Sequence, residues 1–322
     1  MTHSPIGPSR VPQHLWGELF ALLSAAAWAV GVILYRKLGA SLAPLTLNFL
    51  KNALVFGMLV PAVLLVHGLE VPAFTAPEVG LALASGVIGI GIADTLYFRA
   101  LNALGAGRMG ILGNAYSPFV LVLGVAFLGE RLVAQQWVGF ALVSAGVLLA
   151  SWPRRGSPSV LPVPGASPAV GEAIPDPPAH PWRGVLLGLA AVALMAIAIV
   201  LAKRVLEAQP LLWVTGIRMV GALAGMLAIA VIRGETARLR PPPGLRWGPL
   251  VRAAFVGQFL AMVLWLAGYK YTQASVAAVL NETASVFILV LAAWWLAEPL
   301  TRRGVAGVLL TLAGVCCMLW LR

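Results

Sequence analysis

The stretch Leu280–Leu300 (LNETASVFILVLAAWWLAEPL) limits the choice of fold more than any other part of this sequence. It is apolar over a length that can cross a bilayer. A shift of 168 residues places it on Leu112–Leu132 (LGNAYSPFVLVLGVAFLGERL), where nine of the twenty-one aligned residues are identical. About two or three identities are expected by chance in a composition so rich in Leu and Val. The chain is therefore predicted to contain a duplicated membrane unit.

The composition excludes a water-soluble globule. Of the 322 residues, 60% are hydrophobic and only 10% are charged, and the mean hydropathy is +0.92. Apolar runs of roughly 20 residues, the length that spans a bilayer, recur about ten times. The net charge of +11 does not indicate nucleic-acid binding, because Lys and Arg lie mostly at the ends of these runs, where lipid headgroups account for them. Membrane lipids are thus the expected surroundings.

Cysteine and histidine give no metal or redox site. Cys316 and Cys317 are adjacent, which suits neither a disulfide framework nor a set of metal ligands. The four histidines lie in the N-terminal tail or in predicted loops, away from the membrane interior. We therefore expect no cofactor and no metal.

Pro, Gly and charged residues divide the chain into an N-terminal tail (1–16), a first half (17–152), a flexible linker rich in Pro, Gly and Ser (153–182) and a second half (183–322). Five membrane helices are predicted in each half. In the first half they cover 17–36, 44–66, 78–100, 108–128 and 135–152. In the second half they cover 184–203, 210–232, 248–269, 274–297 and 304–321.

The repeat extends over both halves. Trp16 corresponds to Trp182, and Lys51 and Arg218 occupy matching places in the second helix of each half. Because five is odd, the second copy enters the membrane from the opposite side, which gives two inverted five-helix repeats. Such an architecture is typical of transporters, in which a site between the repeats faces either side in turn. The frequent glycines are interpreted as close helix contacts or, alternatively, as hinges.

These features resemble the EamA branch of the drug/metabolite transporter superfamily. The resemblance is carried by the Glu that ends each fourth helix (LGERL at 128–132, LAEPL at 296–300), the Gly-containing fifth helices and the basic residue of each second helix. It implies an all-α integral membrane protein of ten helices in the bacterial inner membrane that moves small metabolites, often exporting amino acids or related compounds. The sequence departs from the pattern at Val286, which matches Pro118 of the first half. This leaves open whether the two halves bend alike.

Four charged residues lie within the predicted hydrocarbon layer and need partners there: Lys51, Asp94, Arg218 and Glu282. Helix direction predicts one ion pair per repeat, Lys51 with Asp94 and Arg218 with Glu282. These pairs are interpreted either as structural locks or as a substrate or proton site. Glu282 has the stronger functional interpretation, because a carboxylate shielded from water near the middle of its helix can exchange a proton when a cavity opens.

Polar residues share helix faces with these charges, and the equivalent positions Asn114 and Glu282 are expected near the axis that relates the repeats. Aromatic residues complete the predicted cavity, although ordinary packing is an alternative explanation for each of them. The full set of candidates for the substrate cavity or for coupling is Trp28, Asn48, Lys51, Asn52, Asp94, Tyr97, Asn114, Tyr116, Ser117, Arg218, Gln258, Trp265, Tyr269, Glu282 and Ser285.

Glu130 and Glu298 receive a structural interpretation. Each lies where its helix leaves the hydrocarbon, and a carboxylate there can accept the free N–H groups of the following helix. No catalytic role is expected for either residue.

Charge at the helix ends gives a prediction of orientation. The two termini and the even-numbered loops hold six Lys and Arg, and the odd-numbered loops hold fourteen. The positive-inside rule then places both termini outside, whereas the resemblance implies cytoplasmic termini for many members of the family.

Three functions remain after this reasoning. The first is a secondary transporter of a small-molecule substrate, with proton coupling through Glu282 as one option; the absence of a G-x-x-x-x-G-K-[ST] loop argues against coupling to ATP. The second is a non-transporting membrane scaffold or sensor. The third is a membrane enzyme acting on lipid, which is disfavoured because no base with an orienting partner is evident. We predict a transporter and not an enzyme, and the sequence leaves the substrate, the direction of transport and the oligomeric state open.

Overall fold

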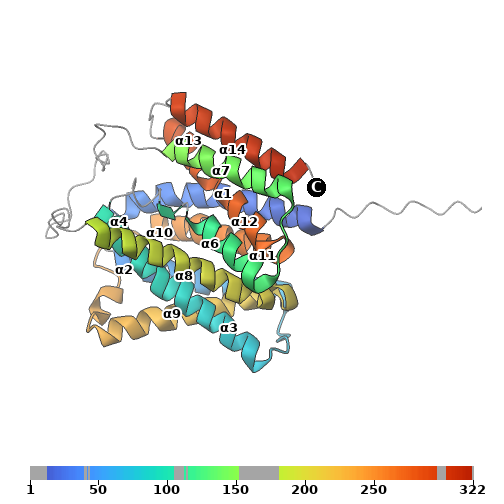
Figure 1. The fold of residues 1–322 in the computed structure, drawn as a ribbon. Helices are drawn as coiled ribbons and strands as arrows, with labels where there is room; N and C mark the ends of the chain where they lie inside the picture. Colours follow the sequence, from blue (N-terminus) through green and yellow to red (C-terminus); the bar gives the residue numbers. More distant parts are fainter. Residues whose placement is uncertain are drawn as a thin grey trace, which may run out of the picture.

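A computed structural model of the chain describes residues 13–39, 42, 44–104, 112–113, 115–151, 181–295 and 302–320 (Figure 1). Within these ranges the regular structure is entirely helical, which confirms the predicted all-α class. The first half contains α1 (Gln13–Gly39), α2 (Pro44–His67), α3 (Ala76–Gly86), η1 (Val87–Ala93), α4 (Asp94–Leu104), α6 (Tyr116–Leu123), η2 (Gly124–Leu128) and α7 (Ala134–Ser151). The second half contains α8 (Pro181–Ala208), α9 (Leu211–Ile232), η3 (Thr236–Leu239), α10 (Trp247–Ala254), η4 (Phe255–Leu260), α11 (Ala261–Tyr271), α12 (Ala274–Asn281), α13 (Ala284–Trp295) and α14 (Arg302–Trp320).

Five of the described helical stretches are long and apolar enough to cross a membrane. They are Leu45–His67, Ala76–Tyr97, Trp182–Ala208, Leu211–Ile232 and Trp247–Tyr271. Large apolar side chains such as Val122, Trp294 and Leu309 are 61%, 77% and 63% exposed on the outer faces of their helices. Helices that are apolar on their outward faces are suited to contact with lipid rather than water. The chain is therefore a multi-pass membrane protein, and the count of ten membrane helices stays a prediction.

Two helices extend into the predicted tail and linker. α1 begins at Gln13, so four residues of the predicted tail are helical, and α8 begins at Pro181, within the predicted linker. Ring contacts hold the start of α1, because Trp16 lies 6.0 Å from Phe20, and Phe20 lies 6.2 Å from Tyr271 of α11. Residues 1–12 and 152–180, to which most of the predicted tail and linker belong, lie outside the described ranges.

The third helix of each half contains a π-helical segment at an equivalent place. η1 separates α3 from α4, and η4 separates α10 from α11. Val87, the first residue of η1, becomes Phe255, the first residue of η4, when the 168-residue shift is applied. π-helical turns are rare and occur often at functional sites. The repeat therefore reproduces a local backbone irregularity as well as the order of the helices.

The predicted helix 274–297 is not continuous. It breaks at Glu282 and Thr283, where the Thr283 N–H donates to the carbonyl of Leu280 three residues earlier, and the Thr283 hydroxyl bonds the same carbonyl at 2.6 Å. At the equivalent place in the first half, the Ala115 N–H donates to the Leu112 carbonyl. Both halves therefore contain the same turn, whether Pro118 or Val286 follows it.

Pro118 does not account for the break in the first half. It is the third residue of α6, in the first turn of that helix, where a missing N–H leaves no bond unmade. The departure from the family pattern at Val286 thus has no visible consequence for the turn.

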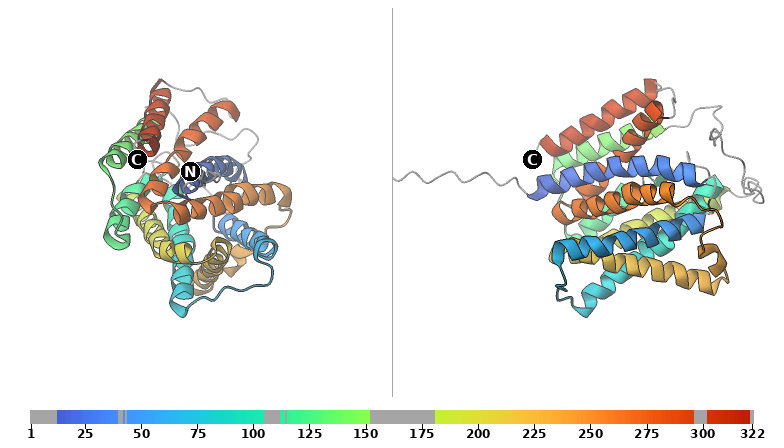
Figure 2. Two further views of the ribbon diagram at one scale, coloured as in Figure 1. Left: turned by 90° about the vertical axis from the view of Figure 1, so that its right-hand side faces the viewer. Right: turned by 180° about the vertical axis from the view of Figure 1, so that it is seen from behind.

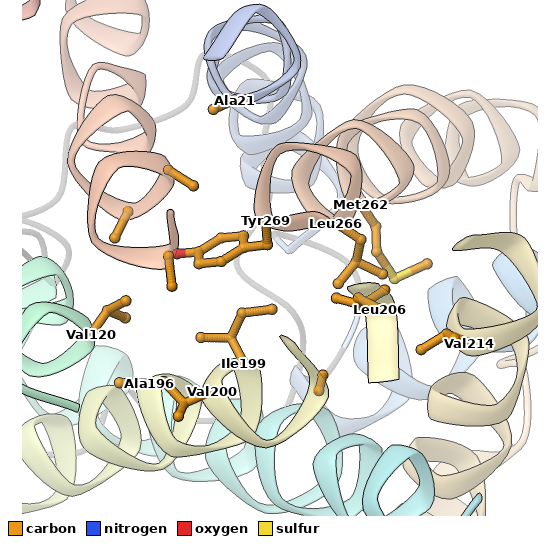
Figure 3. Packing of buried hydrophobic residues seen from close by; sticks show 14 of the residues in the cluster. Ala21, Val120, Ala196, Ile199, Val200, Leu206, Val214, Met262, Leu266 and Tyr269 are labelled. Carbon is orange, nitrogen blue, oxygen red and sulfur yellow. The ribbon is translucent and has the colours of Figure 1, made fainter. Parts of the chain in front are cut away.

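The hydrophobic core lies between α8 and α11. Figure 3 shows Tyr269, Leu266 and Met262 of α11 facing side chains of α8, with Val120 of α6 and Ala21 of α1 at the edges. α1 runs along α11, and α3 with η1 crosses both α8 and α9. The two views of Figure 2 show the same assembly from the end and from behind.

α7 and α14, the fifth helix of each half, form a close pair that lies side by side at the top of Figure 1. Glycines allow this approach. A Cβ atom on Gly146 would overlap Thr311, and one on Gly314 would lie 2.7 Å from the backbone nitrogen of Val143. The contact is thus made by backbone against backbone, as is common between membrane helices.

Adding a methyl group at this crossing is expected to separate the two helices. We predict that Gly146→Ala and Gly314→Ala each lower the stability of the protein by about 1–3 kcal/mol, the usual cost of overpacking. The melting temperature of the purified protein in detergent measures the effect. Gly57→Ala is the matched control, because no atom lies within 4 Å of the added methyl group. Equal melting temperatures for all three variants would contradict this packing.

Candidate functional site

Lys51 lies on α2 and is buried, with 3% of its surface exposed. Its ammonium group lies 4.0 Å from a carboxylate oxygen of Asp94, so the first predicted ion pair is present. The ammonium also donates a hydrogen bond of 3.2 Å to the side-chain oxygen of Gln258 in η4, and it lies 5.5 Å from the centre of the Tyr35 ring. A buried cation thus has both a carboxylate and an amide oxygen as partners, as its desolvation requires.

Arg218 lies on α9 and does not form the second predicted ion pair. Its guanidinium group donates to the Ser85 hydroxyl at 2.6 Å and lies 5.9 Å from the Trp265 ring. The prediction of a pair with Glu282 is wrong because α9 packs on α3. A Cβ atom on Gly86 would overlap the Arg218 backbone, so the glycine brings Ser85 directly beside the arginine. Which helices are neighbours cannot be read from the depth of a residue along its own helix.

The two basic residues make equivalent contacts across the repeats. Lys51 of the first half bonds Gln258 in the third helix of the second half, and Arg218 bonds Ser85 in the third helix of the first half. Gln258 lies within η4, and Ser85 lies two residues before η1. We call these two contacts the cross-repeat tethers. Each tether joins the halves next to a π-helical segment.

Glu282 lies at the break between α12 and α13 and is 8% exposed. Within the described part of the chain, neither of its carboxylate oxygens has a hydrogen-bond partner. The hydroxyls of Ser117 on α6 and Ser144 on α7 face this carboxylate, and they too are buried without a hydrogen bond of normal geometry. Three polar groups from the two halves therefore meet in one buried, unsatisfied cluster.

Two tyrosines connect this cluster to the core. The hydroxyls of Tyr116 on α6 and Tyr269 on α11 lie 2.9 Å apart, within hydrogen-bond distance. The ring of Tyr269 meets that of Trp265 edge to face at 4.9 Å, and it extends over Ile199 in Figure 3. Arg218, Trp265, Tyr269 and Tyr116 thus form a continuous series of contacts that crosses between the halves.

The other candidate residues bond within or between neighbouring helices, or lie at the surface. Asn52 donates to both oxygens of Asn48, and Asn48 donates to the sulfur of Met226 at 3.4 Å. Trp28 is 40% exposed on α1 and lies outside the buried centre. Tyr97 lies near Asp94 on α4, as expected for residues on one helix face. Ser285 is half-buried on α13, and Asn114 lies outside the described residues.

Glu130 caps a helix, but not the predicted one. Its carboxylate accepts the backbone N–H groups of Ala274 and Ser275 at 2.5 and 3.1 Å, together with the Ser275 hydroxyl at 2.6 Å. These groups begin α12 of the other half, rather than the following helix α7. The sequence indicated the chemistry of a helix N-terminus, and the fold selected the helix. Glu298 lies outside the described residues.

Several buried polar residues were not identified from the sequence. Ser85 and Ser144 lie alone in apolar helices, where a serine usually bonds its own backbone. Glu18 is 3% exposed on α1, although it follows directly on the predicted tail. The clue available for Ser85 was its position immediately before the glycine-rich stretch Gly86–Gly91, which suggests a close helix contact.

Comparison with known proteins agrees with this architecture. A sequence profile described as "EamA-like transporter family" matches residues 15–152 and 182–320. A curated relative from Sinorhizobium sp, named "Uncharacterized transporter in cobO 3'region", is 31% identical over 133 residues, which cover 41% of this chain and 94% of the relative. The 133 aligned residues are therefore about as many as the family profile matches in one half of this chain.

A solved structure titled "Crystal structure of protein" is similar over 95% of this chain and 97% of its own, with a TM-score of 0.73 and 20% identity. At this level of identity the similarity shows a common fold.

Removing the Ser85 hydroxyl tests the tether to Arg218. Ser85 accepts from Arg218 and donates to the Ala198 carbonyl at 2.5 Å, so Ser85→Ala leaves a buried guanidinium with one partner fewer. We expect a loss of about 1–3 kcal/mol, because the affected group is charged. Ser24→Ala is the control, since the buried Ser24 hydroxyl bonds only the Ala261 carbonyl at 3.0 Å and should cost about 0.5–1.5 kcal/mol. Thermal unfolding of the two variants measures the difference, and a smaller loss for Ser85→Ala would argue against the tether.

The cap on α12 provides a second test. Glu130→Ala removes three hydrogen bonds at the start of a buried helix and should destabilise the protein by about 0.5–2 kcal/mol, as for other N-caps. Glu70→Ala, at an exposed position between α2 and α3, should have no measurable effect. Hydrogen exchange of the α12 amides gives a local measurement. Unchanged exchange at Ala274 and Ser275 in the Glu130 variant is the result that would reject the cap.

Proposed function

This chain belongs to the EamA-like transporter family, and on that premise we propose that it is a secondary carrier of small metabolites such as amino acids or related solutes. The family is a branch of the drug/metabolite transporter superfamily, which favours a transporter over an enzyme. In this proposal the protein works as an exporter in the bacterial inner membrane. The solute binds between the two halves, which face each side of the membrane in turn.

The observation that carries this proposal is the buried carboxylate of Glu282. An ionised carboxylate held away from water without a partner is costly, and folds seldom retain one without a use for it. Protonation removes the cost. Glu282 lies at a break in its helix, where two short helices can change their relative angle. Opening this region to water on one side of the membrane would allow the proton to leave, and closing it would favour uptake of a proton.

The cross-repeat tethers supply the part that moves. Each tether is a single side-chain hydrogen bond beside a π-helical segment, and its donor comes from the first half in one tether and from the second half in the other. In an alternating-access cycle, one tether would hold one side of the molecule shut while the other is released. Lys51, Gln258, Ser85 and Arg218 are therefore proposed as gating residues, and Tyr116, Trp265 and Tyr269 as the aromatic wall that a solute would contact.

Transport by the purified protein in liposomes tests this function. We expect an imposed pH gradient to drive movement of at least one labelled amino acid or small metabolite from a panel. Glu282→Gln should abolish the dependence on the gradient while leaving the protein folded, because the amide has the same size but cannot gain or lose a proton. Glu70→Gln removes an exposed carboxylate and serves as the control.

Each result has a distinct meaning. Gradient-driven movement that survives in Glu282→Gln would remove the proton role of this residue. Movement that ignores the gradient in the natural sequence would indicate facilitated diffusion, and absence of movement across a broad panel would favour a scaffold or sensor.

A further inference from the structure

A pocket of about 820 Å³ opens at the end of the bundle where α8 and α11 end and α12 begins. None of the candidate residues of the buried centre lines it. Its charged residues are Glu130, Arg131, Lys203, Arg204, Glu207 and Lys270. The volume is typical of sites for small molecules. We call this pocket the basic vestibule.

Positive charge exceeds negative charge in the basic vestibule. Both carboxylates are already engaged: Glu207 bonds the Lys203 ammonium at 2.6 Å and lies near Lys270, and Glu130 caps α12. Of the cations, Arg204 donates to a neutral carbonyl, that of Phe127, at 2.8 Å. Four cations face two carboxylates, so the pocket has an excess of two positive charges. A concave site lined by one sign of charge concentrates ions of the opposite sign.

Lys270 also adds to the excess of positive charge, because neutral carbonyls bind it as one binds Arg204. Its ammonium donates to the backbone carbonyls of Leu206 and of Gln209, the latter at 2.7 Å, at the end of α8. These carbonyls hold the ammonium in place without cancelling its charge. The lysine is therefore fixed at the wall of the pocket and remains a cation there.

The floor of the basic vestibule is built from buried polar side chains. Lys203 is 4% exposed and donates to the carbonyls of Tyr269 and Thr272 at 2.8 and 2.9 Å, which fixes the end of α11. Gln136 is equally buried and reaches Gln273 at 3.4 Å. These hydrogen bonds fix the polar floor in place, so the charges around it are held rigidly.

Membrane topology does not explain this gathering of cations. Four of the six Lys and Arg that the sequence places on this side of the membrane line this one pocket. Residues that only set the orientation of the chain would be spread over the loops and the termini. Their convergence from the loop between η2 and α7, from α8 and from α11 indicates a binding site.

We propose that the basic vestibule binds the carboxylate or phosphate group of a small anionic or zwitterionic molecule. Arg131 and Arg204 supply exposed charge at its mouth, and Lys270 supplies a fixed ammonium group at its wall. Tyr269 links this pocket to the buried centre, because its carbonyl lies under Lys203 and its ring contacts Trp265. A role as the entry site for a carried solute rests on the proposed function, whereas binding itself does not.

Binding to the full chain in nanodiscs of neutral phosphatidylcholine tests the proposal. The probes are L-glutamate, citrate and inorganic phosphate, with putrescine as a cation of similar size, and binding is followed by the rise in melting temperature. The variant is Arg131→Gln with Arg204→Gln, two exposed residues whose loss should leave the fold intact. The matched control is Arg240→Gln with Arg246→Gln, which removes the same charge from exposed positions between α9 and α10.

We expect at least one anion, and not putrescine, to raise the melting temperature, with an affinity that falls about tenfold in the vestibule variant and is unchanged in the control. A second arm adds anionic phosphatidylglycerol without soluble anions. Stabilisation in that arm alone, lost in the vestibule variant, would assign the same oxyanion chemistry to a lipid headgroup. Equal binding by the variant and the control, or no binding in either arm, would overturn the proposal. Because no transport is measured, a failure of the carrier function leaves this outcome untouched.

Discussion

The cost of holding charge away from water shapes the centre of this protein. Lys51 and Arg218 are nearly fully buried, and a buried cation needs polar partners that a single apolar helix cannot supply. Each takes a hydrogen-bond partner from the opposite half, Gln258 for the lysine and Ser85 for the arginine, and Lys51 also pairs with Asp94 of its own half. The requirement for solvation thus joins the two repeats. It also places the junctions beside the π-helical segments, where the backbone already departs from the regular helix.

Close backbone contact makes this arrangement possible. The side chain of Ser85 is short, and its hydroxyl reaches Arg218 only because Gly86 lets α3 and α9 touch at the backbone. The same device pairs α7 with α14 through Gly146 and Gly314. In lipid, association of helices gains little from the hydrophobic effect, so packing and hydrogen bonds have to supply the attraction. Glycine favours both packing and hydrogen bonding, because it brings two helices close enough for small polar groups to bond between them.

The polar residues form two layers along the bundle. One is the buried centre, in which Glu282 faces two serine hydroxyls near the Tyr116–Tyr269 contact. The other is the basic vestibule at the end of the molecule, where charge is exposed to solvent and partly balanced by Glu130 and Glu207. Tyr269 contacts both layers, because its carbonyl accepts from Lys203 of the vestibule and its ring packs on Trp265 of the centre.

The helical class, the membrane environment and the twofold repeat follow from the order of residues alone, because apolar length and a 168-residue self-similarity depend on nothing else. Charge in an apolar run is conspicuous, so the sequence also singled out Lys51, Asp94, Arg218 and Glu282, which the fold largely buries. It paired Lys51 with Asp94 correctly, because the depth of each residue along its helix was sufficient there.

The tertiary structure alone decided the partners that depend on which helices touch. It paired Arg218 with Ser85 instead of Glu282, placed the Glu130 cap on α12 instead of α7, and brought the cations of three distant segments into one pocket. Depth along a helix follows from counting residues, but rotation about the helix axis and the choice of neighbour are set by side-chain and glycine packing between segments far apart in the chain. That information appears only when the helices are assembled.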